Sequence, residues 1–166
     1  MKKNIPSPAK LRFISLDDLI PVIQEQINAG RNVKFSPRGV SMLPMLRQGI
    51  DSVELSAAPE RLKKYDVVLY RRDSGQYVLH RIVSANGTYT CIGDAQFDKE
   101  FGIRRNQIIA VVTSFYRDGR CCSVKNVLYR SYCRIWHYSR EIRRLVKNMA
   151  GWLKRRAGTL FSHSEK

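Results

Sequence analysis

FSPRGVSMLPML, residues 35–46, places Ser41 between a glycine turn and an apolar run, with Pro37 and Pro44 on either side. Proline fixes its own backbone angle, so two prolines stiffen the segment between them. A serine that follows Gly-Val in a loop is ordinarily a turn or capping residue. The same stiff segment could instead present Ser41 as a nucleophile, and the surrounding sequence has to decide between the two interpretations.

Outward from this stretch, the apolar pattern changes from helical to strand-like. Ser15, Asp17 and Asp18 mark a helix start, and apolar residues then recur at helical spacing until Gly30, which predicts a helix over 16–29. Short runs rich in Val, Ile, Tyr and Thr follow, separated by turn signals. They predict strands at 33–36, 52–55, 67–71, 77–83, 88–92 and 107–116, and hence a mainly β, α+β fold with a barrel-like antiparallel or mixed sheet.

The chain has 166 residues, enough for one domain with a real core. Its formal net charge is +16, and residues 120–156 hold eleven Lys or Arg against one acid, Glu141. Such a concentrated basic segment attracts polyanions, either nucleic acid or the anionic face of a membrane.

Helical spacing returns from about residue 125 and predicts one helix of roughly 30 residues, about 45 Å long. We therefore divide the chain into residues 1–120, with the N-terminal helix and the sheet, and 121–166, a basic amphipathic extension. The expected apolar side of that helix comprises Leu128, Tyr132, Ile135, Ile142, Leu145, Met149 and Trp152.

Other sequence signals are negative. Cys91, Cys121, Cys122 and Cys133 lack metal-ligand spacing, and we expect reduced thiols. No run approaches the roughly 20 apolar residues that span a bilayer, and no apolar region follows the basic N-terminus as in a signal peptide. We expect a cytoplasmic protein, or one at the periphery of the inner membrane face, without metal or organic cofactor.

Four short motifs occur in order: GVSMLPML at 39–46, YDVV at 65–68, VLHRIV at 78–83 and IGD at 92–94. Together they resemble the superfamily of type I signal peptidases and LexA-type self-cleaving repressors, over about residues 33–115. His80 stands where many members have lysine, so the chain is similar to the histidine, endoplasmic-reticulum-like variant. Three departures are the longer spacing of Gly49-Ile50-Asp51, Tyr65 in place of glycine, and the lack of a membrane helix ahead of Ser41.

The resemblance implies a serine endopeptidase that cleaves a leader or precursor peptide. Ser41 would be the nucleophile and His80 the general base, whose ordinary pKa near neutrality suits that task. Asp94 or Asp98 would orient the imidazole, and the backbone N–H of Ser41 would stabilise the oxyanion, with no second donor identified.

Plainer interpretations stand beside this one. His80 alone would be an ordinary sheet residue, Asp94 a turn residue, and Met42 and Met45 packing residues. A non-catalytic peptide-binding protein remains an alternative, as does a nucleic-acid-associated regulator, although about 35 residues before the serine motif leave little room for a helix-turn-helix. The C-terminal helix could lie on an anionic membrane, or pack on the sheet or on a protein partner.

Overall fold

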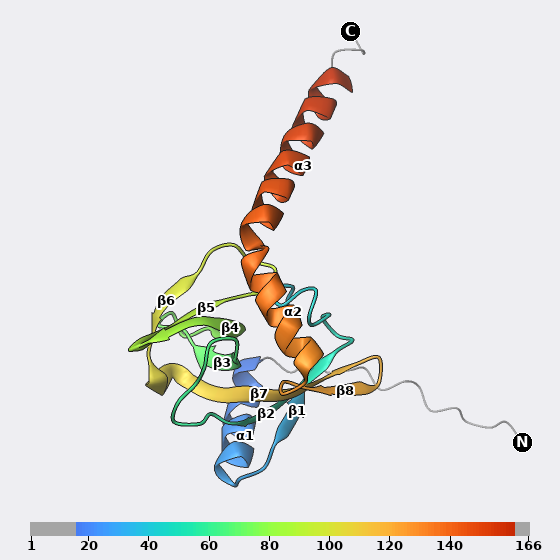
Figure 1. The fold of residues 1–166 in the computed structure, drawn as a ribbon. Coiled ribbons are helices and arrows are strands. Elements are labelled where there is room, and N and C mark those ends of the chain that lie inside the picture. Colours follow the sequence, from blue (N-terminus) through green and yellow to red (C-terminus); the bar gives the residue numbers. More distant parts are fainter. Residues whose placement is uncertain (1–15, 162–166) are drawn as a thin grey trace, which may run out of the picture.

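The computed structural model describes the backbone of residues 16–161 and the side chains of residues 18–152. One antiparallel sheet organises this part of the chain (Figure 1), with strands in the order β1-β2-β7-β3-β4-β5-β6 and β8 paired to β7. The strands are β1 (Val33–Phe35), β2 (Ser52–Ala57), β3 (Val67–Arg71), β4 (Tyr77–Asn86), β5 (Thr88–Ile92), β6 (Glu100–Ile103), β7 (Ile108–Arg117) and β8 (Arg120–Ser123).

The sheet separates two apolar clusters because side chains alternate between its faces. In β3, Val67 and Leu69 enter the larger cluster while Val68 and Tyr70 enter the smaller one. The larger cluster lies between the sheet, α1 (Leu16–Asn28) and the serine segment, to which α1 contributes Ile20, Ile23 and Ile27. The predicted N-terminal helix and the predicted α+β class are therefore confirmed.

The C-terminal part forms two helices, α2 (Val127–Tyr138) and α3 (Arg140–Phe161), where the sequence predicted one. The junction is Ser139, which ends α2 with helical backbone angles and whose hydroxyl donates to the Trp136 carbonyl at 3.4 Å. Such back-bonding by serine bends helices. The α-type bonds Ser139 N–H to Ile135 and Arg143 N–H to Ser139 cross the junction, so the interruption is local.

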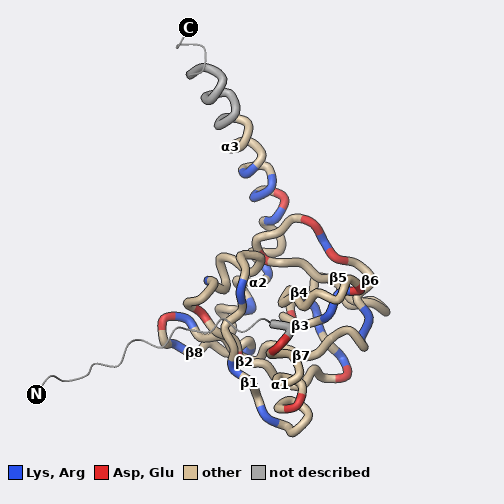
Figure 2. The backbone as a smooth tube through the Cα atoms, turned by 180° about the vertical axis from the view of Figure 1, so that it is seen from behind, with Lys and Arg blue, Asp and Glu red and all other residues tan. Residues whose placement is uncertain are grey.

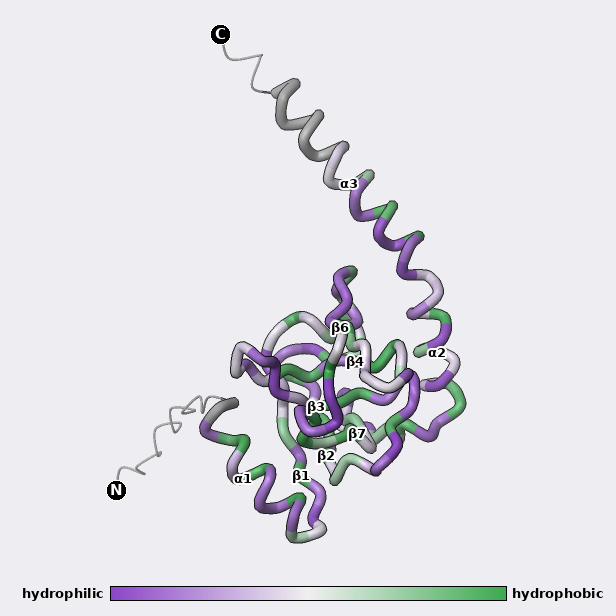
Figure 3. The backbone as a smooth tube through the Cα atoms, turned by 90° about the vertical axis from the view of Figure 1, so that its left-hand side faces the viewer, coloured by the Kyte–Doolittle hydropathy of each residue, from purple (hydrophilic) through white to green (hydrophobic). Residues whose placement is uncertain are grey.

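The expected apolar side of this segment splits between two faces. Tyr129 and Cys133 of α2 are buried in the larger cluster, and Tyr132 packs against it, whereas Leu128 and Ile135 are exposed. Beyond the junction α3 points away from the sheet, with basic residues along it (Figures 1 and 2). Apolar and polar residues alternate along α3 in Figure 3, as expected of an amphipathic helix.

Two strands were not expected from the sequence, β6 and β8. β8 forms a hairpin with β7, in which Arg117 pairs with Arg120. Residues 120–123 thus lie in the sheet, and the start of the predicted extension shares the core of the first 120 residues. None of the helices in the described residues is apolar over a sufficient length to cross a membrane.

Candidate active site

The serine segment, residues 36–51, crosses the end of the sheet between β1 and β2. Met42, Met45 and Leu46 are buried in the larger cluster, which fixes the segment from below. Gly39 takes a positive φ of 96° that suits glycine, and its N–H donates to the Gln48 side chain at 3.1 Å. Ser41 is left half-buried at the top of this packed turn.

Ser41 lies directly against Gly93, the residue that follows β5. Its carbonyl accepts a 2.8 Å hydrogen bond from the Ala95 N–H. A Cβ atom added to Gly93 would lie 2.6 Å from the Ser41 carbonyl oxygen and 3.0 Å from the Ser41 Cβ. Only glycine permits this approach, which brings the first and last predicted motifs into contact.

His80 lies on the sheet face toward which a Gly93 side chain would point. The pairing of β4 with β5 ends at Arg81 opposite Ile92, and the same register extended one residue beyond β5 would set His80 opposite Gly93. Residues directly opposite one another in an antiparallel pair share a face, with Cβ atoms about 5 Å apart. Because Ser41 occupies the space beside Gly93, it lies at the end of the sheet on the His80 face.

The imidazole of His80 is buried, with 1% of the residue exposed, and is held from the Nδ1 side. Nδ1 lies 3.1 Å from a carboxylate oxygen of Glu100 and 3.3 Å from the Tyr70 hydroxyl. Glu100 also accepts from Tyr70 at 2.8 Å and from Arg72 at 2.8 Å. An ionised carboxylate only accepts hydrogen bonds, so Nδ1 carries the proton and Nε2 has a free lone pair.

Burial sets the protonation state of this imidazole. Desolvation lowers the pKa of His80 below its usual 6.5, although the charge of Glu100 acts in the opposite direction and Arg72 adds to the lowering. Burial alone would raise the pKa of Glu100, but its hydrogen bonds from Arg72 and Tyr70 outweigh that effect and lower it. Near neutral pH the pair is thus a neutral imidazole beside a carboxylate, the state that a general base requires.

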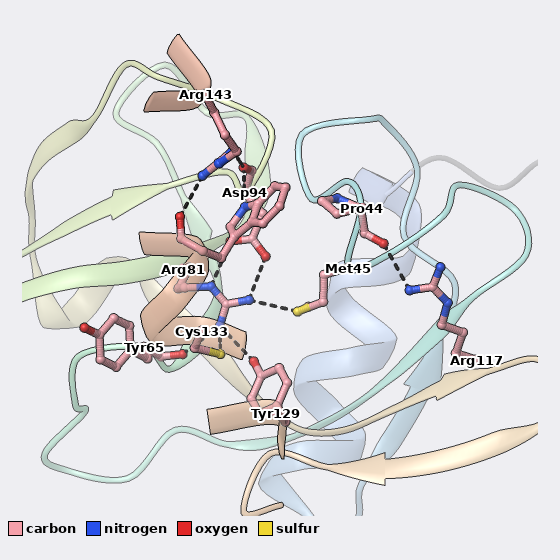
Figure 4. Close-up of polar contacts among 10 residues, drawn as sticks. Pro44, Met45, Tyr65, Arg81, Asp94, Arg117, Tyr129, Cys133 and Arg143 are labelled. Atoms are coloured by element: carbon pink, nitrogen blue, oxygen red, sulfur yellow. Dashed lines mark hydrogen bonds and ion pairs between the residues drawn. The ribbon is translucent and has the colours of Figure 1, made fainter. Parts of the chain in front are cut away.

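Asp94, predicted to orient His80, instead binds Arg81. Arg81 Nε and Nη2 donate to the Asp94 carboxylate at 2.8 and 2.7 Å, and both side chains are almost fully buried (Figure 4). The reason is strand alternation, because Arg81 and Asp94 are each one residue out of phase with His80 and Gly93. The other predicted acid, Asp98, is exposed on the loop before β6.

Arg81 also connects three further segments (Figure 4). Its Nη1 donates to the Tyr65 carbonyl, the Tyr129 hydroxyl and the Cys133 sulfur, and its Nη2 lies 2.8 Å from the Met45 sulfur. One guanidinium thereby connects the serine segment, the segment before β3 and α2 to the turn after β5. This arrangement gives Arg81 a structural task.

A mostly apolar cavity of about 140 Å³ opens beside Ser41. One wall is the segment from Phe35 to Gly39, and the opposite wall is the start of β4. In this part of β4, residues 77–80 pair with β3 but precede the first residue paired with β5, so one backbone edge is unpaired. The cavity therefore lies between a serine and a free strand edge.

Two features of a closed catalytic site are not seen among the described residues: a hydrogen bond from the Ser41 hydroxyl to His80, and a second N–H available to an oxyanion. The Ser41 N–H itself has no backbone partner in this part of the chain, so it is available as one donor. The Gly39 N–H, a neighbouring donor, is already bound by Gln48. Catalytic hydrogen bonds are commonly long in unliganded sites and tighten when substrate binds.

Sequence reasoning missed Glu100. The signal is weak, because the run FDKEFGI lacks clear alternation and therefore predicts no strand around Glu100. Within the described residues no cluster of His, Cys, Asp and Glu could hold a metal ion, and all four cysteines are free thiols. No protein-family model matches the chain, and a search of curated proteins found no relative.

Proposed function

We propose that the protein is a serine endopeptidase of signal-peptidase-like type, with Ser41 as nucleophile and His80 as general base. The observation that carries this proposal is the seating of Ser41 against Gly93, on the face of the sheet that bears His80. In support of the proposal, the imidazole of His80 is buried and its Nδ1 lies 3.1 Å from the Glu100 carboxylate. Glu100, rather than Asp94 or Asp98, takes the orienting position in this proposal.

In the proposed reaction the Ser41 hydroxyl oxygen attacks the scissile carbonyl while its proton passes to His80 Nε2. Glu100 stabilises the imidazolium through Nδ1 and keeps the ring in the correct tautomer. The Ser41 N–H donates to the oxyanion. The imidazolium then returns the proton to the leaving amine, and water hydrolyses the acyl-enzyme by the same base.

The substrate of this peptidase is an extended peptide that adds to the free edge of β4. Main-chain hydrogen bonds to residues 77–80 would hold the peptide, and one side chain would enter the cavity beside Ser41. The small, mostly apolar cavity suits a small residue there. A leader peptide or another precursor meets these requirements.

The test is phosphonylation by a fluorophosphonate probe, in which an activated serine oxygen attacks phosphorus and displaces fluoride. We expect labelling of the wild type, loss of labelling in Ser41→Ala and strong reduction in His80→Ala, with Ser36→Ala, also beside the cavity, as the control. The labelling rate should fall as pH is lowered through the His80 pKa, below 6.5, because the protonated ring cannot accept the serine proton. Equal labelling of all four proteins would overturn the proposal.

A non-catalytic peptide-binding protein is the second candidate, favoured by the missing bond between the Ser41 hydroxyl and His80. It predicts that Ser41→Ala binds peptides as tightly as the wild type and that neither protein reacts with the probe.

A further inference from the structure

The outer side of α2 and α3 carries a continuous line of exposed apolar residues. We call it the apolar stripe and define it as Leu128, Ile135, Tyr138, Ile142, Leu145, Val146 and Met149. Their spacings of mostly three, four or seven residues place them on one side of a helix. Each residue of the stripe is at least 60% exposed.

The stripe runs through the junction between the helices without changing side. The bonds from Ser139 N–H to Ile135 and from Arg143 N–H to Ser139 keep the α-helical period across the junction. From Leu128 to Met149 the stripe is about 32 Å long at 1.5 Å per residue. Tyr129 and Cys133, on the other side of α2, are buried against the sheet, so the stripe points outward.

A cavity with basic walls lies between α2 and the sheet, and it meets the edge of the stripe where Lys64 approaches Tyr138. It has a volume of about 650 Å³ and is bounded by the segment before β3, the middle of β7 and α2. Lys64 links the cavity to the stripe, because its ammonium also lies 5.7 Å from the centre of the Tyr138 ring. We call this the basic cavity; its cationic residues are Arg61, Lys63, Lys64, Lys125, Arg130 and Arg134.

The only acid in the walls of the basic cavity, among the described residues, is Asp66. Its carboxylate accepts a 2.7 Å hydrogen bond from the Lys63 N–H, and therefore already has a partner. Among the described residues, none of the six cations forms an ion pair. The cavity thus suits a small, strongly anionic group such as a phosphate.

Charge argues against a second copy of this chain as the occupant of the stripe. Between residues 127 and 152 the helices carry six Lys or Arg and one acid, Glu141. Helices that pair through an apolar seam need complementary charges along its flanks. Two such helices side by side would instead bring like charges together.

Nucleic acid satisfies the cations but not the stripe. Phosphate contacts would leave the exposed Ile, Leu, Val and Met side chains in water, at no gain from burial. A bilayer with anionic lipids satisfies both features at once, since apolar side chains enter the boundary between headgroups and acyl chains while cations meet the phosphates.

We propose that α2 and α3 form a docking surface for an anionic lipid bilayer, with the apolar stripe in the headgroup boundary and the basic cavity holding a lipid phosphate. This docking does not depend on the peptidase chemistry of Ser41. In this arrangement the axes of α2 and α3 would lie parallel to the plane of the membrane.

The test is sedimentation of the full chain with vesicles of phosphatidylcholine alone or mixed with phosphatidylglycerol. We expect binding to the mixed vesicles and little to the neutral ones. Leu145→Glu with Met149→Glu should reduce binding about a hundredfold, because two exposed apolar groups that would enter the bilayer become charges of the lipid's own sign. Val22→Glu with Ile50→Glu, exposed apolar residues elsewhere, is the matched control and should bind like the wild type.

The basic cavity is tested separately with Arg130→Gln and Arg134→Gln, compared with Arg71→Gln and Arg104→Gln in an exposed hairpin region. We expect the first pair to lose most of the preference for phosphatidylglycerol and the second to keep it. Circular dichroism checks that each variant retains its helices. Ser41→Ala should bind vesicles normally, which separates this outcome from the fate of the peptidase proposal.

Three results would overturn the proposal. One is a wild-type protein that binds neither kind of vesicle. Another is a wild type that dimerises in light scattering through the stripe, with dimerisation lost in the Glu variants and no lipid binding. The third is tight binding to a DNA or RNA duplex with no binding to vesicles.

Discussion

At the scale of single residues, the proposed chemistry depends on the carboxylate at His80 Nδ1. Glu100 reaches that nitrogen at 3.1 Å and is itself fixed by Arg72 and Tyr70. Asp94 is engaged with Arg81, and Asp98 is exposed. The three acids therefore differ in the effect that each substitution should have.

Glu100→Gln should slow probe labelling about tenfold or more, because the imidazolium loses its counter-charge and the ring its fixed tautomer. The charge of Glu100 raises the pKa of His80, so its removal should also move the acid limb of the pH–rate profile to lower pH. Asp98→Asn is the control and should change neither quantity. Slow labelling in Asp98→Asn with a normal rate in Glu100→Gln would contradict the assignment.

Gly93→Ala tests the seating of Ser41. The added Cβ would meet the Ser41 carbonyl at 2.6 Å, so the serine segment must shift. We expect labelling to fall steeply while the free energy of unfolding drops by only about 1 to 3 kcal/mol, the usual cost of overpacking. Gly87→Asn, at an open turn with a φ of 74° that asparagine tolerates, should leave labelling intact.

At the scale of elements, the end of the serine segment is held by an ion pair. Asp51 is fully buried and accepts from the Arg47 N–H at 2.8 Å and from its guanidinium at 2.7 Å. Arg47 also reaches Asp118 in the β7–β8 turn, where the Asp118 side chain is 67% exposed. Two carboxylates thus share one arginine in different surroundings.

Asp51→Asn should lower the free energy of unfolding by about 3 kcal/mol, and Asp118→Asn by about 0 to 1 kcal/mol. The Arg47 hydrogen bonds hold the pKa of Asp51 below its usual 3.8, although burial acts in the opposite direction. The stability from this pair is therefore present above that value and is lost as the pH falls toward the folded-state pKa. Urea unfolding between pH 7 and pH 3 measures how the free energy of unfolding depends on this pair. Equal effects of Asp51→Asn and Asp118→Asn would refute the predicted difference between the two carboxylates.

Most of the helices and strands could be predicted from the sequence, but the contacts between them could not. Apolar periodicity located α1 and six of the strands, because those elements bury one face or both. β6 and β8 escaped because EFGI and RCCS are exposed along most of their length and carry no alternation. Residue contacts such as Glu100 with His80 depend on which strands adjoin, and no local pattern encodes that order.

The same limit explains the C-terminal helices. Helical spacing predicted a single helix over this segment, and the spacing of apolar residues does not say whether a given side of the helix meets the sheet or solvent. Tyr132 and Ile135 looked equivalent in sequence, yet Tyr132 packs inward and Ile135 is 69% exposed. The interruption at Ser139 depends on one hydroxyl–carbonyl bond that a periodicity cannot reveal.

At the scale of the whole molecule, the Arg81–Asp94 pair is a buried ion pair that connects distant segments of the chain. Both side chains are no more than 3% exposed. Removal of one member leaves the other as an uncompensated buried charge, whereas removal of both does not. The arrangement therefore makes a distinctive prediction for a double-mutant cycle.

Arg81→Met should lower the free energy of unfolding by about 3 to 5 kcal/mol, and the double variant with Asp94→Asn by clearly less than the sum of the two single effects. The exposed pair Arg104 and Asp73, 59% and 79% exposed, is the matched control, with about 0 to 1 kcal/mol for Arg104→Met. Urea denaturation of each protein gives the values. Additive effects at the buried pair would contradict the role assigned to it.

The reach of Arg81 also bears on how the chain can be shortened. Its guanidinium bonds to Tyr129 and Cys133 of α2 on one side and contacts Met45 of the serine segment on the other. A chain cut before Val127 would open that guanidinium to water and release the turn that seats Ser41. Cutting within α3, beyond Arg143, would spare these contacts, so any shortened form that preserves the serine segment must keep α2 even if most of α3 is removed.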